Sequence, residues 1–172
     1  MNKLRDCVAY LCAKYPYKQE LSKARLTKMV YLCDWRSTLM RHTPITPIHW
    51  YYNHYGPYVS DVVEVARQDS AFRLETTTNV FGDVKQVVSV SADARWPSLT
   101  TNDIEVLEYI IKQTEMLSWN QFISLVYSTY PIRASERETY LDLGELAKIY
   151  DRTENNATGR SEEEAVTCQT VE

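Results

Sequence analysis

Three histidines, His42, His49 and His54, together with Cys33, are the residues whose types suggest a metal site or a nucleophile. Imidazole and thiolate groups bind metal ions, and a cysteine beside a histidine can act as a nucleophile. If residues 48–55 form a strand, however, His49 and His54 point to opposite faces of it. Cys33 falls on the apolar side of a predicted helix, where thiols are inert. We therefore predict neither a metal site nor a catalytic nucleophile.

The sequence also lacks the motifs of other enzyme classes. Its four glycines, at positions 56, 82, 144 and 159, are too scattered for a phosphate-binding loop. Neither G-x-S-x-G, H-E-x-x-H nor C-x-x-C occurs. The isolated Asp34, Asp61 and Glu64 are expected at helix ends and in solvent rather than in acid–base roles. We predict a protein that is not an enzyme, has no catalytic residues and uses no cofactor.

Composition indicates a single soluble domain. The chain has 172 residues, of which 44% are hydrophobic and 24% are charged, values typical of a globular fold with one core. No apolar run is long enough to span a bilayer, and the start of the chain lacks a signal peptide, so we expect a cytoplasmic protein without a membrane partner. Cys7, Cys12 and Cys33 lie in apolar helical patterns and are expected to be free and buried.

Charge is unevenly distributed along the chain. Residues 1–42 carry nine Lys/Arg against three Asp/Glu, whereas residues 134–172 carry four against ten, and the whole chain has a net charge of −4. An acidic protein is a poor non-specific nucleic-acid binder, because neutralising phosphates supplies most of that affinity. We expect no nucleic-acid partner. The basic first third is read as solvated helix faces, with a local DNA-binding patch as the alternative.

Periodicity predicts a first helix over residues 2–15 and a second over residues 22–42. In the second helix we expect Lys23, Thr27, Asp34, Thr38 and Arg41 on the side opposite the apolar stripe. Residues 48–55 are predicted to form a strand because of their aromatic content. Gly56 and Pro57 would then cap and open another helix that ends near Asp69.

The second half of the sequence predicts a hairpin of residues 72–78 and 84–90, followed by three helices. Their start signals are Thr100 with Asp103, Ser118 with Gln121, and Ser135 with Glu138. The fold class is therefore α+β, a mostly helical single domain with a small antiparallel sheet. We assign residues 1–150 to the domain and residues 151–172 to an acidic, disordered tail, because this segment is too polar to form a core.

Aromatic residues are concentrated in one segment, residues 49–58, which contains Trp50, Tyr51, Tyr52, Tyr55 and Tyr58. Strand alternation places Trp50 and Tyr52 on one face, and Tyr51 and Tyr55 on the other. Either helices cover both faces, or a partner protein covers one of them, since Tyr and Trp dominate interface hot spots.

The order of motifs resembles the SocA-like Panacea antitoxin domain family. Leu26-Thr27-Lys28-Met29-Val30-Tyr31-Leu32-Cys33-Asp34 is similar to its L-x-K-L-L-Y-F-x-D helix. Pro44-Ile45-Thr46, Trp50-Tyr51-Tyr52 and Tyr55-Gly56-Pro57-Tyr58 follow in the order of its P-I-T, aromatic-strand and G-P-V segments. The similarity is strongest over residues 21–66 and extends to about Tyr150. Two departures are His42-Thr43, where the family usually has Gly, and Tyr58 in place of valine.

The resemblance implies a prokaryotic or phage antitoxin that neutralises a cognate protein toxin, encoded by the adjacent gene, by direct binding. Some relatives are adaptors that deliver the toxin to a protease, and a DNA-binding (auto)regulator is a further alternative. We expect Gly56 and Pro57 to form a structural turn. The residues expected to form or support the partner contact are Lys28, Tyr31, Trp35, Trp50, Tyr52, Tyr55 and Tyr58.

Overall fold

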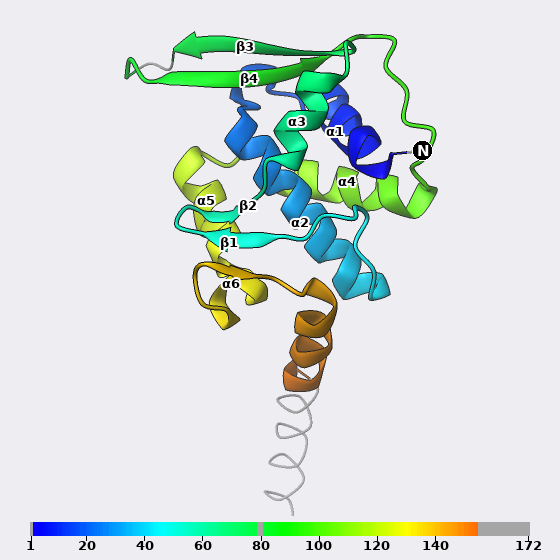
Figure 1. Cartoon of the computed structure of the whole chain (residues 1–172), viewed down its shortest axis with the longest axis vertical. Helices are drawn as coiled ribbons and strands as arrows, with labels where there is room; N and C mark the ends of the chain where they lie inside the picture. Colours follow the sequence, from blue (N-terminus) through cyan, green and yellow to red (C-terminus); the bar gives the residue numbers. More distant parts are fainter. Residues whose placement is uncertain (1, 79–80, 155–172) are drawn as a thin grey trace, which may run out of the picture.

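A computed structural model describes residues 2–78 and 81–154 (Figure 1). The elements in chain order are α1 (Lys3–Lys14), the 3-10 helix η1 (Lys18–Glu20), α2 (Lys23–Arg41), β1 (Tyr51–Asn53), β2 (Gly56–Tyr58), α3 (Asp61–Gln68), β3 (Phe72–Thr78), β4 (Val84–Val90), α4 (Thr101–Thr114), α5 (Trp119–Ser128), α6 (Tyr130–Ala134) and β5 (Thr139–Tyr140). A further helix covers residues 143–154. The predicted α+β class, mostly helical with antiparallel strands, is confirmed. The described strands form two small sheets rather than one.

Helix α2 runs through the centre of the molecule and contacts α1, α3 and α4 (Figure 1). It begins after Ser22, whose Oγ accepts a hydrogen bond from the Arg25 N–H, and ends at His42, which has a positive φ of 56°. Three of the residues expected on the side opposite the apolar stripe, Thr27, Asp34 and Thr38, are buried as well. Neighbouring elements cover this helix on nearly every side. The two threonine hydroxyls donate to the helix's own carbonyls, which satisfies them in the interior.

The predicted hairpin of residues 72–78 and 84–90 is confirmed. Strands β3 and β4 cover these residues and pair from Phe72 with Val90 to Thr78 with Val84. The hairpin is joined to the segment before α2 by a hydrogen bond of 3.1 Å from the Val88 N–H to the Leu21 carbonyl. The hairpin therefore extends across one end of the helical body (Figure 1).

Helix start signals were reliable for α4 and α5, whose capping boxes are both present. The signal at Ser135 is wrong. Glu138 has a positive φ of 62°, and its N–H donates to the Tyr52 carbonyl, so the following residues pair with β1 as strand β5. The last helix starts at residue 143 instead. Residues 151–154 continue that helix, and the rest of the predicted tail lies outside the described residues.

The segment Gly56–Pro57 does not open a helix, contrary to the prediction. It forms strand β2, in which Pro57 lies opposite Tyr52 and Gly56 lies opposite Asn53. Gly56 has a φ of 96°, a conformation that favours glycine. The chain reverses just before it, at His54 and Tyr55, and enters helix α3 only at Asp61. The resulting three-stranded sheet has the order β2-β1-β5.

Cys7, Cys12 and Cys33 are free and buried, as predicted. Burial raises the pKa of the Cys12 thiol to about 12, so this thiol stays protonated and unreactive at neutral pH. Within the described part of the chain, no helix combines the length and apolar character needed to cross a lipid bilayer.

Candidate partner-binding surface

The aromatic strand is fixed to α2 by the carboxylate of Asp34, which is fully buried. Its oxygens accept hydrogen bonds from the Thr46 N–H at 2.8 Å, the Thr46 hydroxyl at 2.5 Å and the Trp50 indole N–H at 2.9 Å. Burial raises the pKa of Asp34 to about 6, although these hydrogen bonds oppose the shift. The expectation that Asp34 lies at a helix end or in solvent is therefore wrong. Its role is to position the strand.

Trp50 and Tyr52 occupy the inner face of this segment, and both are buried. The Trp50 ring packs edge-on against Tyr31, with ring centroids 5.5 Å apart. The Tyr31 hydroxyl shares a hydrogen bond of 2.8 Å with the hydroxyl of Thr129, at the start of α6. Trp50 and Tyr52 therefore belong to the core.

The outer face of the sheet carries a row of three tyrosines. Tyr51 on β1 lies opposite Tyr58 on β2 and Tyr140 on β5, and directly opposed residues share a face. The rings of Tyr51 and Tyr140 are 5.0 Å apart, and the Tyr51 hydroxyl donates to Glu138 Oε2 at 3.0 Å. We call Tyr58, Tyr51 and Tyr140 the tyrosine row. Tyr58 is 44% and Tyr140 74% exposed.

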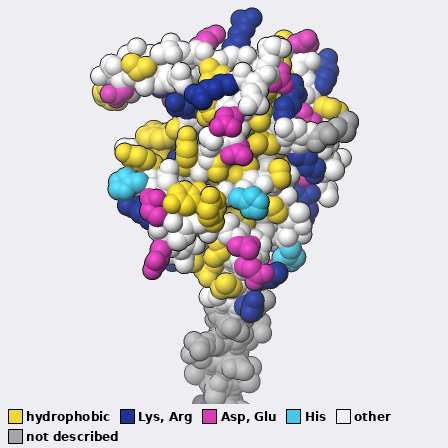
Figure 2. All heavy atoms as spheres, in the orientation of Figure 1, with side chains coloured by type: hydrophobic (Ala, Val, Ile, Leu, Met, Phe, Trp, Pro, Cys, Tyr) yellow, Lys and Arg dark blue, Asp and Glu magenta, His cyan; other side chains and the backbone are white. Residues whose placement is uncertain are grey.

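Tyr55 adds a fourth exposed aromatic at the turn between β1 and β2, where 75% of its surface is accessible. Its ring contacts His54 edge-on at 5.1 Å, and its N–H donates to the side chain of Asn53. Figure 2 shows hydrophobic side chains gathered over the part of the face where Figure 1 draws β1 and β2, with acidic side chains beside them. The sheet thus presents several exposed aromatic side chains.

The predicted contact residues divide between the interior and this surface. Five of them are buried, namely Lys28, Tyr31, Trp35, Trp50 and Tyr52, so they can support a contact but do not present their side chains to a partner. Burial also lowers the pKa of Lys28. Tyr55 and Tyr58 are exposed. The predicted contact set omitted Tyr51, which alternation places on the face opposite Trp50 and Tyr52, and Tyr140. No local signal marks Tyr140, because β5 pairs with a strand from the first half of the chain.

The nine basic residues of the first 42 are engaged with the rest of the protein. Ion pairs join Lys3 and Arg41 to Asp103, and Arg5 to Asp69. Arg25 and Lys28 are buried, and Lys14 and Arg36 lie over aromatic rings. Lys18 and Lys23 donate to main-chain or amide oxygens. Burial or ion pairing therefore occupies five of the nine cations, whereas Lys14, Lys18 and Lys23 remain exposed. Less free positive charge is left than the sequence suggests, which weakens the case for a DNA-binding patch.

In residues 2–78 and 81–154, no three His, Cys, Asp or Glu side chains are placed to share a metal ion. The surface described above offers aromatic rings, phenolic hydroxyls and the free edges of a small sheet. These groups suit recognition of another protein by apolar burial and hydrogen bonds.

The family described as "Antitoxin SocA-like, Panacea domain" matches residues 26–131, which is more than half of the chain. The protein therefore belongs to the SocA-like antitoxin family with the Panacea domain. Neither the curated proteins nor the solved structures gave a match. The matched segment includes α2 from residue 26 onward, β1 and β2, whereas β5 lies beyond its end.

Proposed function

We propose that this protein is the antitoxin of a toxin–antitoxin pair and neutralises its cognate protein toxin by direct binding. It acts without catalysis and without a cofactor, in the cytoplasm, on a toxin encoded by the adjacent gene. Membership of the SocA-like antitoxin family supports the antitoxin role. The exposed aromatic surface of the β2-β1-β5 sheet is the observation that carries direct binding.

The tyrosine row and Tyr55 form the centre of the proposed contact. Tyrosine is enriched at protein interfaces because its ring is apolar while its hydroxyl tolerates water. Covering about 100 Å² of an exposed aromatic side chain gains about 2.5 kcal/mol. Tyr51 is already held in place by Glu138 and Tyr140, so ordering this residue on binding costs little further entropy. A few such anchors are enough for a tight complex.

The buried residues of the family motif support this contact from behind. Asp34 fixes Trp50, and Trp50 packs on Tyr31. The alternating strand then directs Tyr51 outward. This arrangement places the binding residues on a rigid element, which favours precise recognition.

Co-expression with the neighbouring gene tests the proposal. The adjacent gene product is expected to arrest growth when expressed alone, and growth is expected to recover when this protein is present. The two proteins should also elute together in size-exclusion chromatography after purification. An adjacent product that is harmless alone would refute the antitoxin role. Rescue without a stable complex would refute neutralisation by direct binding.

A further inference from the structure

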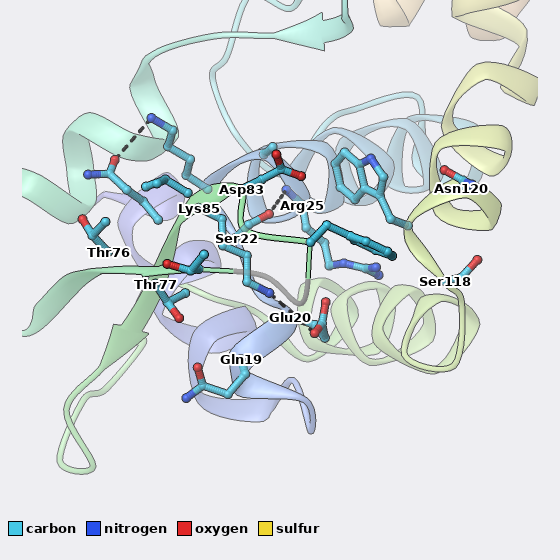
Figure 3. A pocket seen from close by; sticks show the side chains of 17 residues that line it. Gln19, Glu20, Ser22, Arg25, Thr76, Thr77, Asp83, Lys85, Ser118 and Asn120 are labelled. Carbon is cyan, nitrogen blue, oxygen red and sulfur yellow. Dashed lines mark hydrogen bonds and ion pairs between the residues drawn. The ribbon is translucent and has the colours of Figure 1, made fainter.

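A groove separates the β3–β4 hairpin from the first turns of α2 and α5 (Figure 3). Its volume is about 1120 Å³. Figure 3 shows Thr76, Thr77 and Lys85 of the hairpin on one side, and Ser118 and Asn120 of the α5 segment on the other. A smaller hollow of about 440 Å³ shares Arg25 and Trp119 with it. The two hollows are therefore adjacent, and neither is lined by residues of the tyrosine row.

Two helices begin at this groove. Ser22 caps α2 and Ser118 caps α5, and both residues line the cavity. The N-terminal end of a helix carries a partial positive charge, which an acidic side chain in the first turn often offsets. Neither of these first turns contains an acidic residue. The positive ends of both helices are thus left without an anionic side chain of their own.

Arg25 lies at the junction of the two hollows and is only 2% exposed. It donates to the Tyr15 hydroxyl at 3.2 Å and to the Leu117 carbonyl at 3.3 Å. Its Nε has no hydrogen-bond partner, and no carboxylate of the described residues pairs with it. The guanidinium packs over Phe122 instead, 4.7 Å from the ring centre. A buried charge without a counter-ion attracts an anion more strongly than an exposed one, because the surrounding dielectric is low.

The remaining charges of the larger hollow limit what it can bind. Lys85 pairs with Glu20 at 3.5 Å, and Lys23 donates to Gln86 at 3.2 Å. With Asp83, the lining contains three basic and two acidic residues. The smaller hollow adds Glu115. With so little excess positive charge, the larger hollow suits a ligand with a single carboxylate, on the hairpin side of Arg25. A polyphosphate carries too much negative charge for it.

Exposed apolar side chains flank the charged centre of the groove. Phe81 is 87%, Met116 75% and Trp119 44% exposed, and each lines one or both hollows. Apolar side chains on both sides of a positive centre complement a protein segment with an acidic residue between apolar ones.

We propose that this groove binds an extended segment of a partner protein, in which one Asp or Glu is flanked by apolar side chains. The carboxylate lies at Arg25 and the N-terminal ends of α2 and α5. The apolar neighbours pack on Trp119 and Phe81. This site is separate from the tyrosine row and does not depend on the partner's being a toxin.

Selection of short random peptides on the full-length protein tests the proposal. Bound peptides are expected to be enriched in Asp or Glu next to Leu, Ile, Phe or Trp. Asn120→Asp then adds a negative charge inside the groove, while at the start of α5 it favours the helix. We expect this variant to bind the selected peptides about tenfold more weakly in fluorescence anisotropy, because of like-charge repulsion. Trp119→Ser is expected to weaken binding as well.

Two controls make the result decisive. Asn102→Asp places the same charge in the first turn of α4, outside the lining of both hollows, and should leave peptide binding unchanged. Tyr140→Ala, on the tyrosine row, should also leave it unchanged. The proposal is overturned if no peptide is enriched, if the enriched peptides lack acidic residues, or if Asn120→Asp binds them as well as the native protein. Displacement of the peptides by inorganic phosphate or ATP at micromolar concentration would instead assign the groove to small anions.

Discussion

The indole N–H of Trp50 donates a hydrogen bond of 2.9 Å to the carboxylate of Asp34, which joins the aromatic strand to the middle of α2. Both residues are fully buried. The bond explains why an acidic residue lies in the core of this fold, since the carboxylate satisfies the indole and two donors of Thr46. The position of the exposed tyrosine row therefore depends on the buried contact between Asp34 and Trp50.

Replacement of Asp34 by asparagine is expected to lower the free energy of unfolding by about 2–4 kcal/mol. An amide has one acceptor oxygen where the carboxylate has two, and its NH₂ group would face a donor inside the core. Urea denaturation monitored by tryptophan fluorescence measures the change. Asp61→Asn makes the same chemical change at an exposed position and should cost no more than about 0.5 kcal/mol. Equal stability losses in the two variants would contradict the role of Asp34.

Stability is expected to fall as the pH rises from about 4 to about 6, because of Asp34. The pKa of this group is raised from 3.8 to about 6 in the folded protein, so the folded state holds a proton that the unfolded state releases in this range. This stabilisation is complete at a pH below the pKa of the unfolded state, and it is lost as the pH rises through the pKa of the folded state. The free energy of unfolding falls by about 3 kcal/mol over this range.

Denaturation curves at closely spaced pH values provide the measurement, with Asp34→Asn as the control that removes the slope. Asp69, Asp93 and Asp103 have lowered pKa values. Their stabilising effect is lost only as the pH falls below about 4, so it does not mask the Asp34 effect. A native protein with a flat profile between pH 4 and 6 would show that Asp34 titrates normally.

Gly56→Ala is expected to destabilise the protein more than Gly82→Ala. Both glycines have a positive φ, 96° and 89° respectively, that an alanine adopts only with strain of about 1–3 kcal/mol. A methyl group at Gly56 would also lie 3.4 Å from the Tyr127 ring, whereas at Gly82 it would meet nothing within 4 Å. Thermal unfolding of both variants measures the difference. Equal shifts would mean that the Tyr127 ring moves aside at no cost.

Tyr140→Ala is expected to abolish neutralisation in vivo while leaving the fold intact. The side chain is 74% exposed and its ring contacts only Tyr51 among the aromatic rings of the described residues, so the free energy of unfolding should change by no more than about 1.5 kcal/mol. Loss of a central anchor should weaken toxin binding by about 2 kcal/mol or more, close to thirtyfold. Isothermal titration calorimetry with the purified toxin provides the value. Tyr109→Ala, an exposed tyrosine on α4, is the matched control. Comparable losses in both variants would place the toxin contact elsewhere.

Local signals in the sequence predicted the elements that local interactions stabilise. The hairpin over residues 72–90 and the capping boxes at Thr100 and Ser118 all formed where expected. Each depends on residues close together in the chain. The same type of signal failed at Ser135, because pairing of Thr139 and Tyr140 with β1 competes with a helix there. Such a long-range contact leaves no local pattern in the sequence.

Prediction of the candidate site was limited by the same difficulty. Aromatic content correctly identified the segment, and alternation correctly placed Trp50 and Tyr52 together on one face. Which face of the segment is buried depends on how α2 packs against it, where the Tyr31 ring contacts Trp50. The sequence does not distinguish a tyrosine that lies in the core from one that lies at an interface. The predicted contact set therefore contains Tyr31 and Tyr52 as well as Tyr55 and Tyr58. Their burial separates them.

Because strand β5 is far from β1 and β2 in the chain, the aromatic surface is completed late in synthesis. Tyr58 and Tyr51 leave the ribosome long before Tyr140, so a nascent chain carries two members of the row and lacks the third. The complete surface forms only when residues 139–140 have emerged and paired with β1. A transcript cut or a ribosome stalled before codon 140 therefore yields a chain that contains the whole family-matched segment and still lacks part of its proposed toxin contact.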